Sequence, residues 1–138
     1  MSRSLGIAAA LTLAAAAAAF AAAGSDWAPF GEANVVRIVT QDEDGDERDT
    51  PVWIVVVDGA AYVRTNASHW LANIRRGSSV ALRLDSTTRP VSAEEVADPA
   101  VVASVEAAYK AKYGFVQRVM SFFRVREPTV LRLREKAS

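Results

Sequence analysis

The chain has 138 residues, with no cysteine and a single histidine, and its 16 basic side chains balance 16 acidic ones. These counts exclude disulfides, thiolate metal ligands, cysteine nucleophiles and a histidine-rich metal centre. A chain without a basic surplus is also not typical of a nucleic-acid-binding protein.

The first residues, Met1–Ala23, predict an export or anchoring segment. One basic residue, Arg3, precedes a charge-free run from Leu5 onward, and small residues suited to a signal peptidase end the run. Because alanine dominates, the insertion free energy is marginal for a permanent membrane span. We therefore favour a cleaved signal peptide over an uncleaved anchor, with the mature protein in a bacterial periplasm. Contact with the membrane is expected only if the leader stays attached.

The remainder predicts a connector over residues 24–33 and one domain over residues 34–138, which is an ordinary domain size. Its first half contains apolar runs rich in β-branched residues, which favour strands. The expected strands are Asn34–Thr40, Thr50–Val57, Ala60–Thr65 and Ser79–Leu84. The unbroken apolar run in Val52–Val57 indicates burial on both faces, as in a closed or partly closed sheet.

Two turns are expected between these strands. Asp58-Gly59 is a two-residue hairpin signal. The polar stretch Gln41–Asp49 forms the tip of the preceding hairpin. Its acidic run, Asp42–Glu47, invites a calcium hypothesis, but the glycine is misplaced for an EF-hand loop. A solvated hairpin tip is the preferred interpretation, and no metal site is expected.

A short helix should follow the third strand. Ser68 is suited to cap its N-terminus, Trp70, Leu71 and Ile74 share one face, and Gly77 suits the C-cap.

The second half predicts a longer helix between two strands. Thr87–Ala97 is expected to form a short strand and a turn, and Thr129–Leu133 a closing strand. Asp98-Pro99 gives a strong helix start. We expect that helix to end at Gly114, with Phe115–Phe123 forming a second short helix or a turn. The basic side chains on this segment could contact a ligand or partner, but a solvated helix face is preferred; they are Lys110, Lys112 and Arg118.

The step from the third strand into the short helix is the best candidate for chemistry. The backbone N–H groups that open a helix attract anions such as phosphate. Arg64, Thr65 and Ser68 lie next to that point in sequence and would complete a phosphate site through charge-assisted hydrogen bonds. Ordinary helix capping beside a surface arginine would use the same residues, so both interpretations stay open.

The segment TPVWIVVVDGAAYVRT, followed by SHWLANIRRG and a strand, resembles the flavin-binding split-barrel proteins, which include pyridoxamine phosphate oxidase. More narrowly, Trp53–Arg64, Trp70 and the AAYKAKYG segment at residues 107–114 resemble an uncharacterised bacterial branch of that group. The resemblance covers roughly residues 34–134. It implies a mainly β (α+β) fold, a six-stranded Greek-key split β-barrel with one short inserted helix and a later helical excursion.

The same resemblance implies a homodimer with flavin mononucleotide (FMN) between the subunits. Arg64, Thr65, Ser68 and His69 would hold the cofactor phosphate, and Trp70 would pack beneath that loop. A flavin- or deazaflavin-dependent oxidoreductase needs no protein nucleophile, because the cofactor carries the electrons. No catalytic residue is assigned, and no nucleophile elbow surrounds His69 to suggest a hydrolase.

Two alternatives to a flavin-dependent oxidoreductase remain. One is a non-catalytic module of the cell envelope that binds a ligand or partner and has a vestigial cofactor site. The other is an accessory protein tethered to the membrane by its leader.

Overall fold

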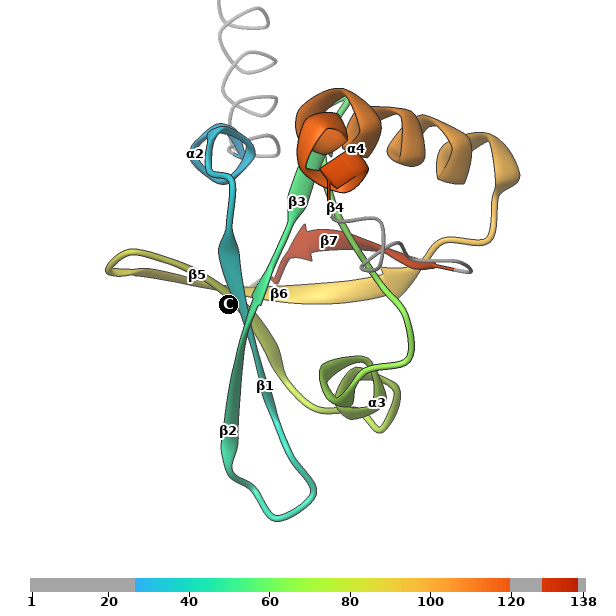
Figure 1. Cartoon of the computed structure of the whole chain (residues 1–138). Coiled ribbons are helices and arrows are strands. Elements are labelled where there is room, and N and C mark those ends of the chain that lie inside the picture. Colours follow the sequence, from blue (N-terminus) through green and yellow to red (C-terminus); the bar gives the residue numbers. More distant parts are fainter. Residues whose placement is uncertain (1–26, 120–127, 137–138) are drawn as a thin grey trace, which may run out of the picture.

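The computed structural model describes residues 27–119 and 128–136 (Figure 1). The predicted leader, Met1–Ala23, lies outside these ranges. The elements, in chain order, are α2 (Ala28–Glu32), β1 (Val36–Gln41), β2 (Glu47–Val52), β3 (Ile54–Val57), β4 (Ala60–Thr65), α3 (His69–Arg75), β5 (Val80–Leu84), β6 (Thr87–Glu95), α4 (Pro99–Val119) and β7 (Thr129–Glu135). No helix within the described ranges is long and apolar enough to cross a membrane.

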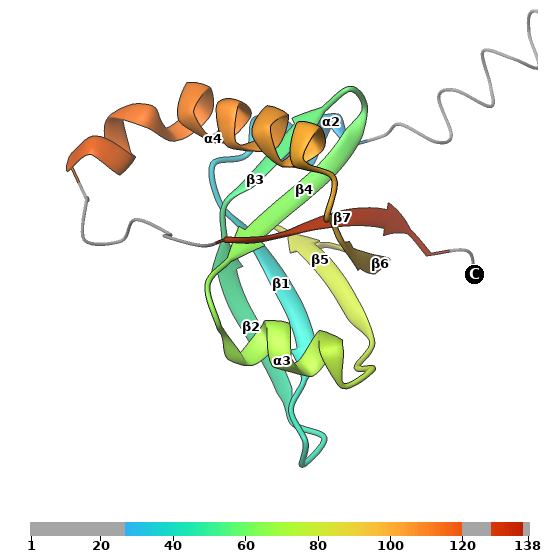
Figure 2. The ribbon, with the colours of Figure 1, turned by 90° about the vertical axis from the view of Figure 1, so that its right-hand side faces the viewer.

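The strands form one seven-stranded antiparallel sheet in the order β2-β1-β5-β6-β7-β4-β3. β2 and β3 lie at opposite ends of this order, although Trp53 alone separates them in the chain. Because two Cα steps span at most about 7 Å, the two ends of the sheet must meet. The sheet therefore curls into a half-closed barrel (Figure 2).

The predicted split β-barrel is confirmed, with one change in the number of strands. The long strand expected over Thr50–Val57 is broken at Trp53, so the sheet has seven strands instead of six. Two pairings join strands that are not consecutive in the chain, β1 with β5 and β4 with β7, as a Greek-key arrangement requires.

The Asp58-Gly59 turn is confirmed. Both residues have positive φ, 50° and 77°, and Val57 lies directly opposite Ala60. Positive φ at both central positions is the type I′ geometry that matches the twist of the flanking strands.

The barrel encloses the main hydrophobic core, to which strands and two short helices contribute. α2 supplies Phe30 and its N-cap residue Trp27, and α3 supplies Trp70 and Leu71. The stretch expected to be a connector thus contains a helix whose side chains are buried in the core. Five residues are too few to show a helical period in the sequence.

α4 packs outside the barrel, along β3 and β4 (Figure 2). A second core cluster forms there, consisting of Val55, Tyr62, Val105, Tyr109, Tyr113 and Val130. The expected helix end at Gly114 is wrong, because the backbone stays helical to Val119. Gly114 lacks the left-handed backbone that Gly77, the confirmed C-cap glycine, adopts at φ 96°. The rest of the Phe115–Phe123 prediction, including how its side chains pack, lies outside what is described.

Candidate functional site

The break between β2 and β3 exposes backbone groups that α4 satisfies. The Tyr109 hydroxyl donates to the carbonyl of Trp53 at 2.8 Å. The Tyr113 hydroxyl donates to the carbonyl of Asn34 at 2.7 Å and accepts from the backbone N–H of Ile54 at 3.2 Å. Buried backbone groups without partners are costly, so these two hydroxyls allow the strand to break inside the protein.

Lys112 adds a third connection to the same place. Its Nζ donates to three backbone carbonyls, those of Gly31 at 2.9 Å, Ala33 at 2.7 Å and Ile54 at 2.7 Å. An ammonium has three protons, and each has an acceptor here. The prediction that Lys112 lies on a solvated face is therefore wrong, whereas Lys110 is exposed as predicted.

Burial affects how these groups titrate. Desolvation raises the pKa of Tyr109 and of Tyr113 above the ordinary value of 10.0. Desolvation also lowers the pKa of Lys112, although its three carbonyl acceptors favour the charged form.

Planar side chains extend from the strand break toward β4. Trp53 stacks on Tyr113 with ring centroids 4.4 Å apart, and Tyr113 lies 5.8 Å from Tyr109. The guanidinium of Arg64 lies over the Tyr109 ring, 4.2 Å from its centroid. Arg64 is thus held against an aromatic face by a cation–π contact.

Arg64 also forms an ion pair with Glu106 of α4, through Nη1 and Oε2. The Arg64 side chain is 9% exposed and that of Glu106 is 35% exposed. The second carboxylate oxygen of Glu106, Oε1, is buried and has no hydrogen-bond partner within the described ranges.

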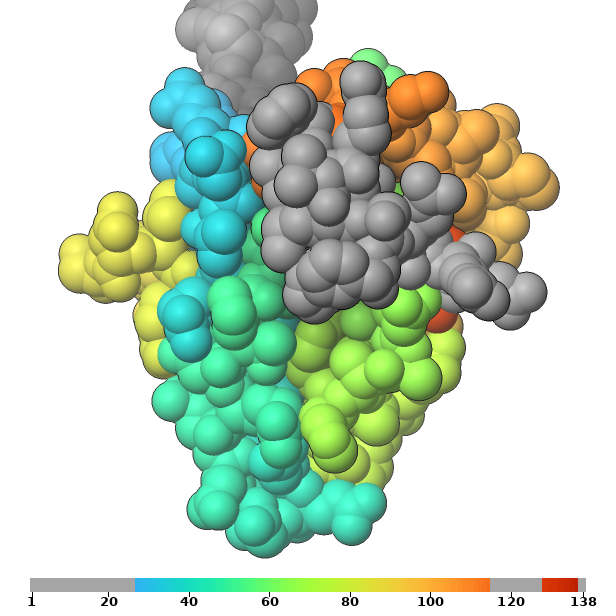
Figure 3. Space-filling view, in the orientation of Figure 1, coloured from blue at the N-terminus to red at the C-terminus, as the bar shows by residue number. Residues whose placement is uncertain are grey.

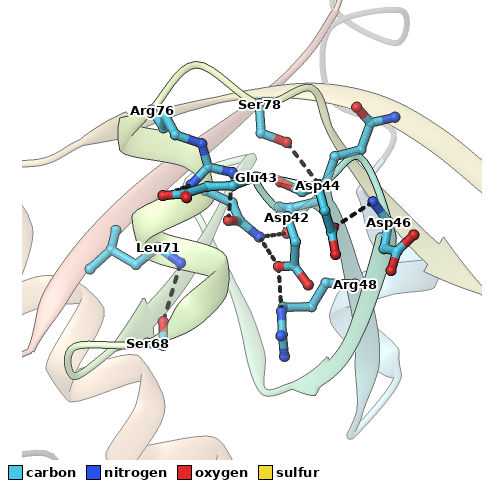
Figure 4. Close-up of polar contacts among 12 residues, drawn as sticks. Asp42, Glu43, Asp44, Asp46, Arg48, Ser68, Leu71, Arg76 and Ser78 are labelled. Atoms are coloured by element: carbon cyan, nitrogen blue, oxygen red, sulfur yellow. Dashed lines mark hydrogen bonds and ion pairs between the residues drawn. The ribbon is translucent and has the colours of Figure 1, made fainter.

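The four predicted phosphate ligands do not share one set of contacts. Arg64 faces α4, whereas Thr65, next in the strand, points to the other face and lies opposite Thr129. The Ser68 hydroxyl accepts from the backbone N–H of Leu71 at 3.2 Å, which confirms the predicted N-cap (Figure 4). His69 is exposed.

α3 is fixed by a separate polar network at the β1–β2 hairpin (Figure 4). The buried Asn73 donates from Nδ2 to Thr40 Oγ1 at 3.0 Å and to Asp42 Oδ1 at 2.8 Å, and its own Oδ1 accepts from Arg76 at 3.0 Å. Arg48 also donates to Asp42, at 2.7 Å. These bonds hold the hairpin against α3, and the two lie side by side on the surface (Figure 3).

The acidic hairpin tip is accounted for by this network and by a turn. The pKa of Asp42 is lowered, first by the hydrogen bond from Arg48, then by that from Asn73, with a smaller effect of His69. Asp44 accepts from the backbone N–H of Asp46 at 3.0 Å. Within the described part of the chain, no group of His, Asp and Glu side chains could hold a metal ion.

The sequence interpretation missed Glu106 and the role of Lys112. Glu106, Tyr109 and Tyr113 are spaced by three and four residues, which places them on one helix face. That spacing was visible in the sequence, but neither the strand break that the two tyrosines contact nor the approach of Glu106 to Arg64 was. Chemically, the site offers a fixed guanidinium beside aromatic rings, an arrangement suited to an anion on a planar ligand.

Residues 26–133 match the family described as "Uncharacterized protein conserved in bacteria (DUF2255)". The chain belongs to this family. This DUF2255 match confirms the resemblance to an uncharacterised bacterial branch, which residues 107–114 carry in part. In the structure, Tyr109, Lys112 and Tyr113 of that segment hold α4 on the barrel. No curated protein sequence matches the chain significantly.

Solved structures with the same fold include ligand-binding proteins. HutZ, the heme storage protein from Vibrio cholerae, is 15% identical, with a TM-score of 0.59 over 78% of this chain and 84% of HutZ. A FAD-binding protein from Mesorhizobium loti is 12% identical, with a TM-score of 0.55 over 78% and 83%. The F420-H2 dependent reductase FDR-A is 16% identical, with a TM-score of 0.55 over 72% and 93%. At these identities the likeness establishes the split-barrel fold of this DUF2255 protein.

Proposed function

We propose that this protein binds a flavin-type nucleotide, with FMN the preferred candidate, and acts as an oxidoreductase when it is loaded. The observation that carries the proposal is Arg64, a nearly buried guanidinium held against the ring of Tyr109. Support comes from split-barrel proteins that bind FAD or heme or are described as F420-H2 dependent.

In this proposal Arg64 is the main partner of the ligand phosphate. Thr65, Ser68 and His69 are lesser candidates, because Thr65 points to the other face of β4, the Ser68 hydroxyl already caps α3, and His69 is exposed. When bound, the flavin or deazaflavin supplies hydride or electron transfer. The protein residues hold the cofactor in place and provide the positive charge that binds its phosphate.

The test is ligand-dependent stability of the purified protein. A ligand that binds the folded state at a hundred times its dissociation constant adds about 2.7 kcal/mol to the free energy of unfolding. We expect the melting temperature to rise with FMN, and Arg64→Gln to remove that rise. Riboflavin, which lacks the phosphate, is the matched control ligand and should give a smaller shift. A melting temperature that does not respond to saturating FMN, FAD or F420 contradicts the proposal.

One observation favours a second candidate, a non-catalytic ligand-binding module. Arg64 already has an anionic partner within the chain, Glu106, so the anion site of the unliganded protein is occupied. The two candidates differ in turnover. An oxidoreductase cycles the bound flavin between its reduced and oxidised forms when an electron donor and an acceptor are supplied, whereas a binding module leaves the bound flavin unchanged.

We also propose that the protein is exported through its N-terminal segment. The charge-free run after Arg3 supports this proposal. N-terminal sequencing of the protein from cells tests it, because a cleaved signal peptide gives a mature chain that begins near Gly24. An intact Met1 in a membrane fraction would instead indicate a tether.

A further inference from the structure

The carboxylate of Glu106 is only half satisfied. Oε2 pairs with Arg64, while Oε1 is buried and lacks a hydrogen-bond partner among the residues described. Leaving a buried acceptor unpaired is unfavourable. The exposed pair between Arg75 and Glu95 shows the usual arrangement, with both carboxylate oxygens bonded, at 2.6 and 3.2 Å.

The two partners of the Arg64–Glu106 pair differ in how they are held. Arg64 is 9% exposed, belongs to a strand with a neighbour on each side, and stacks on Tyr109. Glu106 of α4 is 35% exposed, so its side chain has a path to solvent. When the pair separates, Glu106 is therefore the side chain that moves.

We infer that Glu106 is an internal competitor for the ligand anion. Its carboxylate pairs with the guanidinium of Arg64 in the unliganded protein, and a ligand phosphate displaces the carboxylate. The exchange replaces one anion by another at Arg64 and releases the buried Oε1 to water. This inference rests on the proposed function, because it takes Arg64 to be the phosphate partner.

The competition makes Glu106 a specificity-determining residue. A ligand without an anionic group gains nothing from displacing the carboxylate, whereas a phosphate forms charge-assisted bonds that are among the strongest available to arginine. The affinity for a phosphorylated ligand is reduced by the competition, and the affinity for its unphosphorylated form is not.

The experiment compares Glu106→Gln with wild type and with two other variants. Glutamine keeps the shape of glutamate and removes its charge. Glu95→Gln is the matched control, since it removes the carboxylate of another arginine pair, and Glu106→Gln combined with Arg64→Gln removes the anion site itself. Dissociation constants for FMN and riboflavin are measured by flavin fluorescence, and for inorganic phosphate by the NMR signals of arginine Nε–H groups.

We expect Glu106→Gln to bind FMN and inorganic phosphate about tenfold more tightly than wild type, which corresponds to about 1.4 kcal/mol. Riboflavin affinity should stay unchanged, Glu95→Gln should match wild type, and the double variant should lose the gain. Equal or weaker binding of phosphate and FMN by Glu106→Gln overturns the inference. If the melting temperature of this variant also falls, the Arg64–Glu106 ion pair serves only to stabilise the fold.

The outcomes separate this inference from the proposed function. If Arg64→Gln abolishes FMN binding while Glu106→Gln changes nothing, the inference fails and the proposed function stands. If neither wild type nor Glu106→Gln binds FMN or phosphate, both fail. If only Glu106→Gln binds them, the inference holds and the wild-type site is shown to be closed by its own carboxylate.

Discussion

Lys112 illustrates how a single residue stabilises an irregular backbone. Next to the β2–β3 break, the Lys112 ammonium donates to three backbone carbonyls, of which only that of Ile54 belongs to a strand. The three carbonyls come from the end of α2, the residue after it, and β3. Lys112 thus joins the C-terminal end of α2 to β3.

We predict that Lys112→Met lowers the free energy of unfolding by about 2 kcal/mol, because it removes a donor from three partly buried carbonyls. Lys110→Met is the matched control and should change stability by less than about 0.5 kcal/mol, since Lys110 is exposed two residues away. Urea unfolding measures both variants. Equal effects would show that the carbonyl contacts contribute little.

The two buried tyrosines of α4 predict how the stability of the protein depends on alkaline pH. The pKa values of Tyr109 and Tyr113 are raised in the folded state, so the folded protein holds these protons more tightly than the unfolded chain. Their contribution is complete below the unfolded value of 10.0 and is lost as pH rises through the folded pKa values. We expect melting temperature to fall above about pH 10, and to fall less in Tyr113→Phe. Tyrosinate absorbance that titrates alike in folded and urea-unfolded protein would contradict this.

At the scale of elements, α3 owes its position to polar bonds as much as to its apolar face. Trp70 and Leu71 bind it to the core, as its sequence predicted. Asn73 determines where the hairpin meets it, through Thr40 and Asp42. Buried amides that satisfy several partners fix the relative placement of the elements that carry them.

We expect Asn73→Ala to lower the free energy of unfolding by about 1–3 kcal/mol, because it leaves the buried hydroxyl of Thr40 without its donor. Asn66→Ala, in the exposed loop before α3, is the control and should have little effect. Hydrogen exchange provides a second measurement, since amides of the β1–β2 hairpin should exchange faster only in the Asn73 variant. Unchanged exchange there would show that the hairpin holds its place without Asn73.

At the scale of the whole molecule, the sheet closes because its two end strands, β2 and β3, follow each other directly in the chain. β2 pairs with β1 and β3 pairs with β4, and the chain between them is a single residue. α2 and α3 add aromatic side chains to the enclosed core, while α4 covers the outside of β3 and β4 (Figure 1). The proposed ligand site lies under α4, outside the barrel.

The resemblance to flavin-binding split barrels predicts a homodimer. If the chain assembles in this way, sedimentation equilibrium will give twice the mass of a single chain, which is 14.8 kDa for all 138 residues. The melting temperature will also rise with protein concentration, because association stabilises the folded state by mass action. A monomer at all concentrations, with and without FMN, would contradict the prediction.

Local sequence determined the features that depend on contacts between residues close together in the chain. The Asp58-Gly59 turn, the Ser68 cap, the Gly77 C-cap and the start of α4 after Asp98 follow from backbone preferences and short-range hydrogen bonds. The β-rich pattern and the resemblance together predicted the split barrel. The turn, the two caps and the helix start need few or no distant contacts.

Tertiary structure alone decided the rest. The break at Trp53 depends on hydroxyl and ammonium groups that lie 56 to 59 residues further along the chain, so no local pattern could reveal it. Gly114 could not be distinguished from a helix end, because burial of Tyr109 and Tyr113 against the sheet outweighs the modest cost of glycine in a helix. The partner of Arg64 was equally hidden, because Glu106 is 42 residues away in the chain and meets it only when α4 packs on β4.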